Sequence, residues 1–177
     1  MMLAAAIVAA FGLGGCNSNR APDNGGTDLH RTETRAIGGN TKTTGRVCQL
    51  LQDDNPNRGG RKVVYRCNGR AVLASDEAKR LLNPSVPVSF GGSGSVVQSN
   101  LITRQAANAT GKSDETACER AFINAAHKFQ ATAQSRNANR VSNFHSYYNR
   151  KILRGGQYDC EVGTFHARVV MRGDIAR

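Results

Sequence analysis

Apolar residues recur at helical spacing over one long stretch, from Asp114 to about Ser135. The recurring positions are Cys118, Ala121, Phe122, Ala125, Phe129 and Ala133. Residues three and four apart lie on the same face of a helix, so the pattern predicts an amphipathic helix with Cys118 on its buried side. Ser113 is a suitable N-cap, and the polar run at 136–139 ends the helix.

Alternating apolar residues after this helix predict two β-strands. The first covers residues 141–150 and the second residues 157–171, with a loop at 151–156 between them. Within the second strand the apolar residues change parity at Gly163, which suggests a β-bulge there. A helix followed by two antiparallel strands is typical of α+β folds, so we expect one long helix packed on a small antiparallel sheet.

The stretch 46–67 predicts a β-hairpin ahead of this α-β-β unit. Two short apolar strands flank residues 53–60, which are rich in Asp, Asn, Pro and Gly. A symmetric hairpin places Cys48 opposite Cys67 and Leu50 opposite Tyr65. The two cysteines would then share one face of adjoining strands, close enough for a disulfide.

Further elements are expected between the hairpin and the long helix. Ser75 as N-cap, followed by two acidic residues, predicts a short helix that stops at Pro84. Residues 86–90 are then expected to form a strand. After a glycine-rich turn, residues 95–104 are expected to form its partner.

The N-terminus has the pattern of an export signal. Residues 3–11 form an apolar run that is too short to span a bilayer, and it leads into a Leu-Gly-Gly-Cys sequence ending at Cys16. That sequence resembles the lipobox of bacterial lipoproteins, which implies a signal peptide at 1–15 and lipidation of Cys16. The alternative is a hydrophobic N-terminal helix with an incidental cysteine. Residues 16–44 are expected to be a flexible tether, and Asn17 favours the outer membrane by the same resemblance.

Charge changes the picture of possible partners. The chain has 24 Lys and Arg against 13 Asp and Glu, a net charge of +11. This favours anionic partners such as lipopolysaccharide, phospholipid head groups or acids linked to peptidoglycan. The alternative is a basic surface without a specific partner. Because the chain has no Trp and no basic run interleaved with aromatics, a nucleic-acid partner is not expected.

Four cysteines besides Cys16 fit two disulfides in an exported chain, and the sequence permits three pairings. Zinc is the competing interpretation, but no two of these cysteines have CxxC spacing. With a loop centred near residue 153, His145 falls opposite Val162 and not opposite His166. Both histidines are therefore expected at the surface, and no metal or other cofactor is expected.

Several short blocks in the second half of the chain have a recognisable order. They are 111–115, 117–118, 139, 143, 146–148, 158–160, 163 and 173–176. With these blocks, residues 86–177 resemble a family of small exported bacterial proteins that often carry the label "excinuclease ATPase subunit". More distantly, they resemble the outer-membrane lipoprotein that senses envelope stress in the Rcs pathway. The resemblance implies an α+β fold with disulfides, to which the hairpin of 46–67 is an addition. Arg140 and Phe144 depart from it, because small or aliphatic residues are usual there.

The label can be traced to a P-loop-like stretch at 106–113, whose candidate nucleotide-binding residues are Gly111, Lys112 and Ser113. A working P-loop needs a buried strand before it and a carboxylate on a second apolar strand. Residues 100–104 are a poor buried strand, and 169–174 are a weak second motif. Lys112 and Ser113 are better interpreted as an exposed lysine beside a helix N-cap.

The disulfide pairing follows from the hairpin and from the resemblance together. The family-like region contains only Cys118 and Cys160, and the hairpin contains Cys48 and Cys67. We therefore expect the bridges Cys48–Cys67 and Cys118–Cys160. The alternative joins Cys48 or Cys67 to Cys118.

The sequence thus predicts a single α+β domain at 45–177 and a lipid-anchored envelope protein without catalytic machinery. Its expected role is binding or sensing at the periplasmic face of the outer membrane, with anionic envelope components or envelope proteins as partners. The alternatives are a nucleotide-binding ATPase, as the family label says, and a passive binder of anionic polymers.

Overall fold

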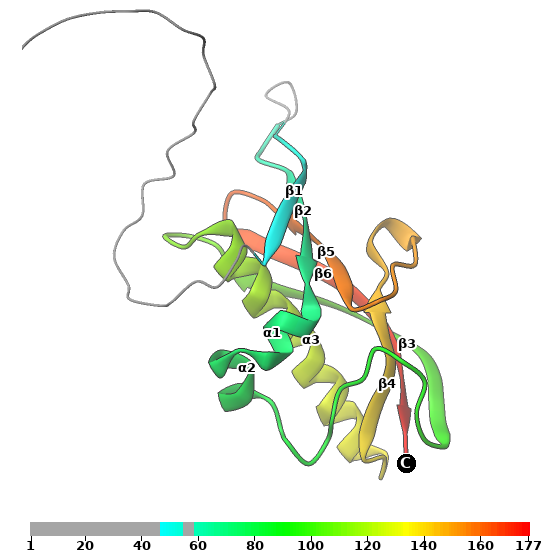
Figure 1. Ribbon diagram of the computed structural model, residues 1–177. Coiled ribbons are helices and arrows are strands. Elements are labelled where there is room, and N and C mark those ends of the chain that lie inside the picture. Colours follow the sequence, from blue (N-terminus) through cyan, green and yellow to red (C-terminus); the bar gives the residue numbers. More distant parts are fainter. Residues whose placement is uncertain (1–46, 55–58) are drawn as a thin grey trace, which may run out of the picture. The chain divides into compact units, whose positions relative to one another are not determined.

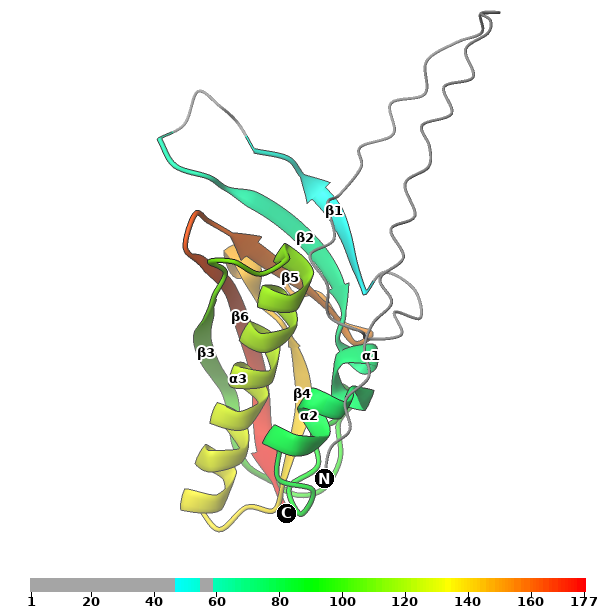
Figure 2. The same cartoon turned by 90° about the vertical axis from the view of Figure 1, so that its left-hand side faces the viewer.

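The computed structural model describes residues 47–54 and 59–177. In this part of the chain six strands form one sheet, and three α-helices lie together on one of its faces (Figures 1 and 2). The expected architecture, a long helix packed on an antiparallel sheet, is confirmed. The expected signal peptide at 1–15, Cys16 and the tether at 16–44 lie outside the described residues.

The hairpin is formed by β1 (Cys48–Gln52) and β2 (Val63–Asn68). Cys48 pairs with Cys67 and Leu50 with Tyr65, so the expected register is confirmed. β2 also pairs along its whole length with β5 (Gln157–Val162), from Val63 opposite Val162 to Asn68 opposite Gln157. The hairpin therefore continues the sheet.

Three α-helices follow from local capping. Asn68 caps α1 (Gly69–Ala74), an element that the sequence pattern did not reveal, by accepting from the backbone of residues 70 and 71. Ser75 caps α2 (Asp76–Leu81) and Ser113 caps α3 (Asp114–Ser135), as expected. The bounds of α3 match those predicted from its apolar stripe.

Residues 86–90 do not form the expected strand. Only Val88 bridges to Val141, because Pro84 and Pro87 lack backbone donors and turns surround them. The expected partner, which the structure extends to β3 (Val96–Asn108), pairs instead with β6 (His166–Ala176). β6 is longer than the segment 86–90, and β3 pairs with it along nearly its whole length.

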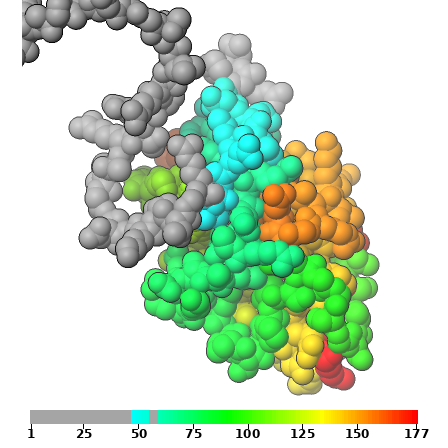
Figure 3. Space-filling view, in the orientation of Figure 1, coloured from blue at the N-terminus to red at the C-terminus, as the bar shows by residue number. Residues whose placement is uncertain are grey.

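The prediction of a single strand at 157–171 is also wrong. The chain reverses at residues 163–165, so the change of parity at Gly163 marks a turn between β5 and β6 and not a bulge. The strand expected at 141–150 ends earlier: β4 (Arg140–Ser146) gives way to a 3-10 turn, η1 (Tyr148–Arg150). The loop that follows projects beside β5, in orange in Figures 1 and 3.

β6 is the central strand of the sheet. β3 pairs along one edge of it, while β5 and β4 share the other edge. β4 thus pairs with β6 and not with β5, which places His145 opposite Arg172 where Val162 was expected. The order of helix, strand and strand had suggested a local hairpin between the strand at 141–150 and the next strand along the chain. In the structure, β4 pairs with the more distant strand β6.

The core lies between α3 and the sheet. The Phe122 ring stacks on Tyr158 at 4.4 Å between ring centroids, and Phe144 packs edge-on against Phe122 and Phe129. All three phenylalanines and Tyr158 are buried. Burying such rings is the main stabilisation that this face of the sheet provides.

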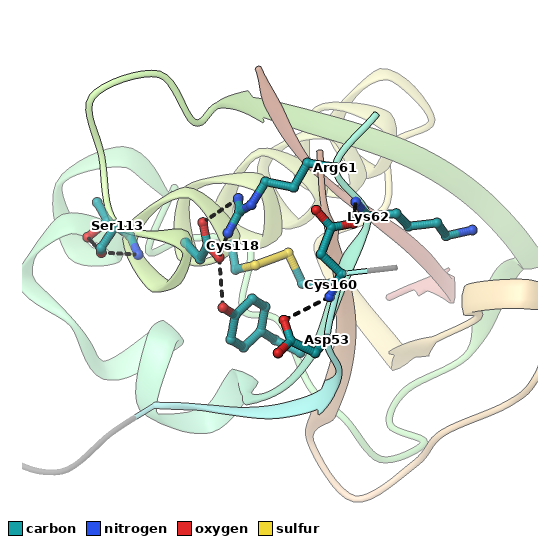
Figure 4. A network of polar contacts seen from close by, with 10 residues as sticks. Asp53, Arg61, Lys62, Ser113, Cys118 and Cys160 are labelled. Atoms are coloured by element: carbon teal, nitrogen blue, oxygen red, sulfur yellow. Dashed lines mark hydrogen bonds and ion pairs between the residues drawn. A yellow bond between two sulfur atoms is a disulfide. The ribbon is translucent and has the colours of Figure 1, made fainter. Parts of the chain in front are cut away.

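Both disulfides have the pairing that the sequence favoured. Cys118–Cys160 joins α3 to β5 inside the core (Figure 4). Cys48–Cys67 joins β1 to β2. In the same region Asp114, the first residue of α3, binds Arg61 and Tyr65 from the hairpin. The hairpin is thus attached to the core by β2–β5 pairing and by polar contacts with α3.

Candidate functional site: the basic face of the sheet

The register of β6 separates the sheet into a covered and an open face. Residues opposite each other across two strands share a face, and successive residues alternate. Ala167, Val169 and Met171 are buried under α3. Arg168, Val170 and Arg172 therefore lie on the other face, over which no α-helix of the described residues packs (Figures 1 and 2).

Three arginines converge on this open face. Ile102, Arg104 and Ala106 of β3 stand opposite Arg172, Val170 and Arg168 of β6. Arg104 is therefore a diagonal neighbour of both Arg168 and Arg172, at about 7–8 Å between Cα atoms. We refer to Arg104, Arg168 and Arg172 as the arginine cluster.

The cluster has no carboxylate partner within residues 47–54 and 59–177. The ion pairs there are Arg61–Asp114, Lys62–Glu161, Arg66–Asp159, Lys79–Asp76 and Arg120–Glu77. Glu161 stands opposite Arg168, but it binds Lys62 at 3.3 Å and the Tyr148 hydroxyl at 2.6 Å. Glu161 is therefore engaged by other partners and forms no ion pair with Arg168.

Arg172 is held in place from two sides. Its guanidinium donates to Asn100 Oδ1 at 2.6 Å and lies over the Tyr147 ring, 5.1 Å from the centroid. Its Nε is buried and has no hydrogen-bond partner. A guanidinium that is already oriented loses less side-chain entropy when it binds an anion.

The buried carboxylate of Asp174 holds Asn100 in place. Asp174 is only 8% exposed, and it accepts from Asn100 N at 2.8 Å and from Asn143 Nδ2 at 2.6 Å. Both asparagines have positive φ, 60° and 49°, in the left-handed region that Asn tolerates better than most residues. The ladders of β3 and β4 shift register at these places. Asp174 thereby fixes the residue that orients Arg172.

His145 belongs to the same region, and its expected surface position is wrong: it is 6% exposed, because β4 pairs with the central strand β6 and places it opposite Arg172, with Arg154 and Asp174 near it. Its Nδ1 donates to Asn143 O, and its Nε2 has no partner. Burial lowers the pKa of His145, and nearby Arg154 and Arg172 lower it further, although the bond to Asn143 opposes this.

His166 is exposed, as expected. It lies six residues from Arg172 along β6, about 20 Å. Because Arg172 stands opposite His145, the two histidines do not form a pair.

The P-loop-like residues are not brought together with a second motif. Lys112 is exposed, and the Ser113 hydroxyl caps α3 by accepting from Thr116 N. The preceding strand, β3, lies at the edge of an antiparallel sheet, and most of its residues are exposed or half-buried. It is therefore not the buried strand that a P-loop follows. Asp174, the carboxylate of the weak second motif, contacts Asn100. Asn100 lies eight residues, about 27 Å, along β3 from Asn108, where the P-loop-like loop begins.

Sequence reasoning missed the arginine cluster. It depends on the pairing of β3 with β6, which joins residues about 60–70 positions apart. The local signal was that Arg168 and Arg172 share one parity among the apolar residues of 166–172, and this stretch was assigned to a longer strand. The two asparagines at 100 and 143 gave no signal that they share one carboxylate.

Among the described residues, no helix is both long and apolar enough to cross a bilayer. In the same part of the chain no group of three or more His, Cys, Asp or Glu side chains is arranged to hold a metal ion. No family model, curated protein or solved structure matches the chain.

Proposed function

We propose that this chain is a non-enzymatic envelope lipoprotein that binds anionic envelope components through the arginine cluster. The observation that carries the proposal is the register of β3 on β6, which gathers Arg104, Arg168 and Arg172 on the open face. Lipidation of Cys16 would hold the protein at the membrane, at the periplasmic face of the outer membrane. Binding there is the basis of a structural or sensing role.

Guanidinium groups suit this task. Arginine presents a planar fork of donors that matches the oxygens of phosphates and carboxylates, and such charge-assisted bonds are stronger than neutral ones. Arg168 is exposed and Arg172 is oriented by Asn100 and Tyr147. The cluster therefore combines an exposed guanidinium and an oriented one on the same surface.

The test compares two variants with the same loss of charge. In the cluster variant, Arg104→Gln, Arg168→Gln and Arg172→Gln are combined. In the control, Arg80→Gln, Lys128→Gln and Arg136→Gln are combined, all at exposed positions on or next to the helices of the other face. Both are made in the full chain with Cys16→Ala, so that no acyl chain contributes to binding.

Binding is measured by titration with a water-soluble, delipidated lipopolysaccharide core. The cluster variant should lose at least about tenfold in affinity, equivalent to one charge-assisted hydrogen bond. The control should lose much less, and binding should weaken steeply with salt. Equal losses in both variants would overturn the proposal and indicate passive binding through total charge.

The anchor has its own test. Cys16→Ala should abolish labelling by a palmitate analogue in a bacterial host and move the protein out of the membrane fraction. Unchanged labelling of the variant would contradict the lipoprotein assignment without bearing on the arginine cluster.

A further inference from the structure

The turn between β5 and β6 presents an apolar side chain to solvent. Phe165 is 64% exposed, more than any other large apolar residue of the described chain. The turn is short and fixed: Gly163 N donates to His166 O at 2.9 Å, and Phe165 O accepts from Ala109 N at 2.8 Å. A ring held in this position costs hydration free energy and gains no packing.

Basic groups lie beside this turn. A pocket of 240 Å³ beside it is lined by Arg61, Glu161, Phe165, His166 and Arg168, together with the turn backbone. Asp114 binds Arg61, and Glu161 is bound by Lys62 and Tyr148. Arg168 is left without a carboxylate partner in the described chain.

A second cation lies in the neighbouring loop. Ala109, which donates to Phe165 O, also accepts from Lys112 N at 3.2 Å, so a tight turn leads from this contact to Lys112. The Lys112 side chain is exposed. Phe165 and Arg168 therefore line one pocket, and Lys112 lies three residues beyond the backbone contact of Ala109 with Phe165, in the loop before α3.

We propose that this end of the domain docks on an anionic phospholipid bilayer, with Phe165 entering the headgroup region and Arg168 and Lys112 binding lipid phosphates. Aromatic rings favour the membrane–water interface, and basic side chains are attracted to anionic lipid surfaces. A bilayer contacts the ring and both cations at once. A free phosphate would contact only the cations and leave the ring exposed.

This docking surface overlaps the anion site under "Proposed function" only at Arg168. It would also supply a second attachment for a chain anchored by lipid, since stable membrane association usually requires two signals. Docking through Phe165 stands if the arginine cluster binds no soluble anion.

The chain contains no Trp, so Phe165→Trp places a single Trp at the turn, whose emission is excited apart from that of the four tyrosines. The matched control is Val96→Trp, which is 53% exposed in the wild type and pairs with Ala176 at the opposite end of β6. Both are made in the full chain with Cys16→Ala. Each is titrated with vesicles of phosphatidylcholine alone or mixed with phosphatidylglycerol.

The Phe165→Trp emission should shift to shorter wavelength with phosphatidylglycerol vesicles and be quenched by brominated lipid chains. It should not shift with phosphatidylcholine alone, and Val96→Trp should shift in neither case. An unshifted Phe165→Trp spectrum, or an equal shift at both positions, would overturn the proposal.

Phe165→Ser and Lys112→Gln complete the test. Each should weaken sedimentation with phosphatidylglycerol vesicles while binding of the soluble lipopolysaccharide core stays unchanged. Arg104→Gln combined with Arg172→Gln should do the reverse, so failure of one proposal is distinguished from failure of the other. Unchanged sedimentation of Phe165→Ser would contradict docking through the turn.

Discussion

The carboxylate of Asp114 accepts two hydrogen bonds from the guanidinium of Arg61, at 2.9 and 2.5 Å, although 53 residues separate the two in the chain. The Tyr65 hydroxyl donates a third at 2.7 Å. Burial alone would raise the pKa of Asp114, but the bonds from Arg61 and Tyr65 outweigh it and lower the pKa. Burial, and then the bond to Asp114, raises the pKa of Tyr65 to about 12, so this hydroxyl stays a donor.

Replacing Asp114 by Ala should lower the free energy of unfolding by about 2 kcal/mol, the value of hydrogen bonds to a charged group discounted for the solvent exposure of Arg61. Asp76→Ala is the control, because Asp76 also begins a helix but its side chain is 88% exposed. Urea denaturation at pH 7 measures both. A loss at Asp114 no larger than at Asp76 would contradict the structural role of this contact.

Removing the two disulfides should have unequal effects. Cys118–Cys160 closes a separation of 42 residues and Cys48–Cys67 one of 19. Chain entropy predicts losses of about 4 and about 3 kcal/mol when each pair is replaced by Ala. The first pair also lies fully in the core, so its loss leaves a cavity. Denaturation midpoints rank the two variants, and the reverse ranking would show that the hairpin bridge is the more important one.

His145 should make stability depend on pH. Its pKa in the folded protein is lowered from the ordinary value of 6.5, chiefly by burial. Below pH 6.5 the unfolded chain therefore binds a proton that the folded chain does not, so stability falls as pH decreases from 6.5 and levels off below the folded pKa. His145→Gln should flatten this slope, whereas His127→Gln on the exposed side of α3 should keep it. An unchanged slope in His145→Gln would contradict the buried, neutral state.

Two glycines should differ in their tolerance of a side chain. A Cβ at Gly69 would lie 2.8 Å from Gly156 O and 2.9 Å from the Phe122 ring, whereas a Cβ at Gly111 would meet open space. Gly69→Ala should cost about 2–3 kcal/mol through overpacking, because one of the two close contacts is with backbone. Gly111→Ala should cost only about 1 kcal/mol, because its φ of 71° is unfavourable for Ala. Equal thermal midpoints would contradict the close packing of α1 against α3.

Local patterns in the sequence were sufficient for the elements that depend on neighbouring residues. The apolar stripe and Ser113 gave the bounds of α3, and turn residues gave the register of Cys48 on Cys67. The pairing of β4 and β3 with β6 depends on residues far apart in the chain. From the sequence alone, several strands with the same alternation of apolar residues could have paired with β6. The change of parity at Gly163 had two structural explanations, a bulge and a reversal, and the pattern alone did not separate them.

The candidate site was less predictable for the same reason. Arg104 and Arg168 meet only because β3 lies beside β6. Asn100 and Asn143 stand in strands, where Asn is unusual, but their shared contact with Asp174 requires the assembled sheet. A charge count predicted an anionic partner, and only the register locates the surface that would bind it.

The central place of β6 has a consequence for the order of folding. β3, β4 and β5 all precede β6 in the chain, and each finds a pairing partner in it. During synthesis these strands leave the ribosome before their common partner exists, so the sheet closes only after residue 176 has emerged. Late closure of non-local pairs slows folding and leaves strand edges exposed meanwhile. The surface that carries the arginine cluster therefore comes into being only with the last strand of the described fold, whereas the hairpin of β1 and β2 needs no part of that strand.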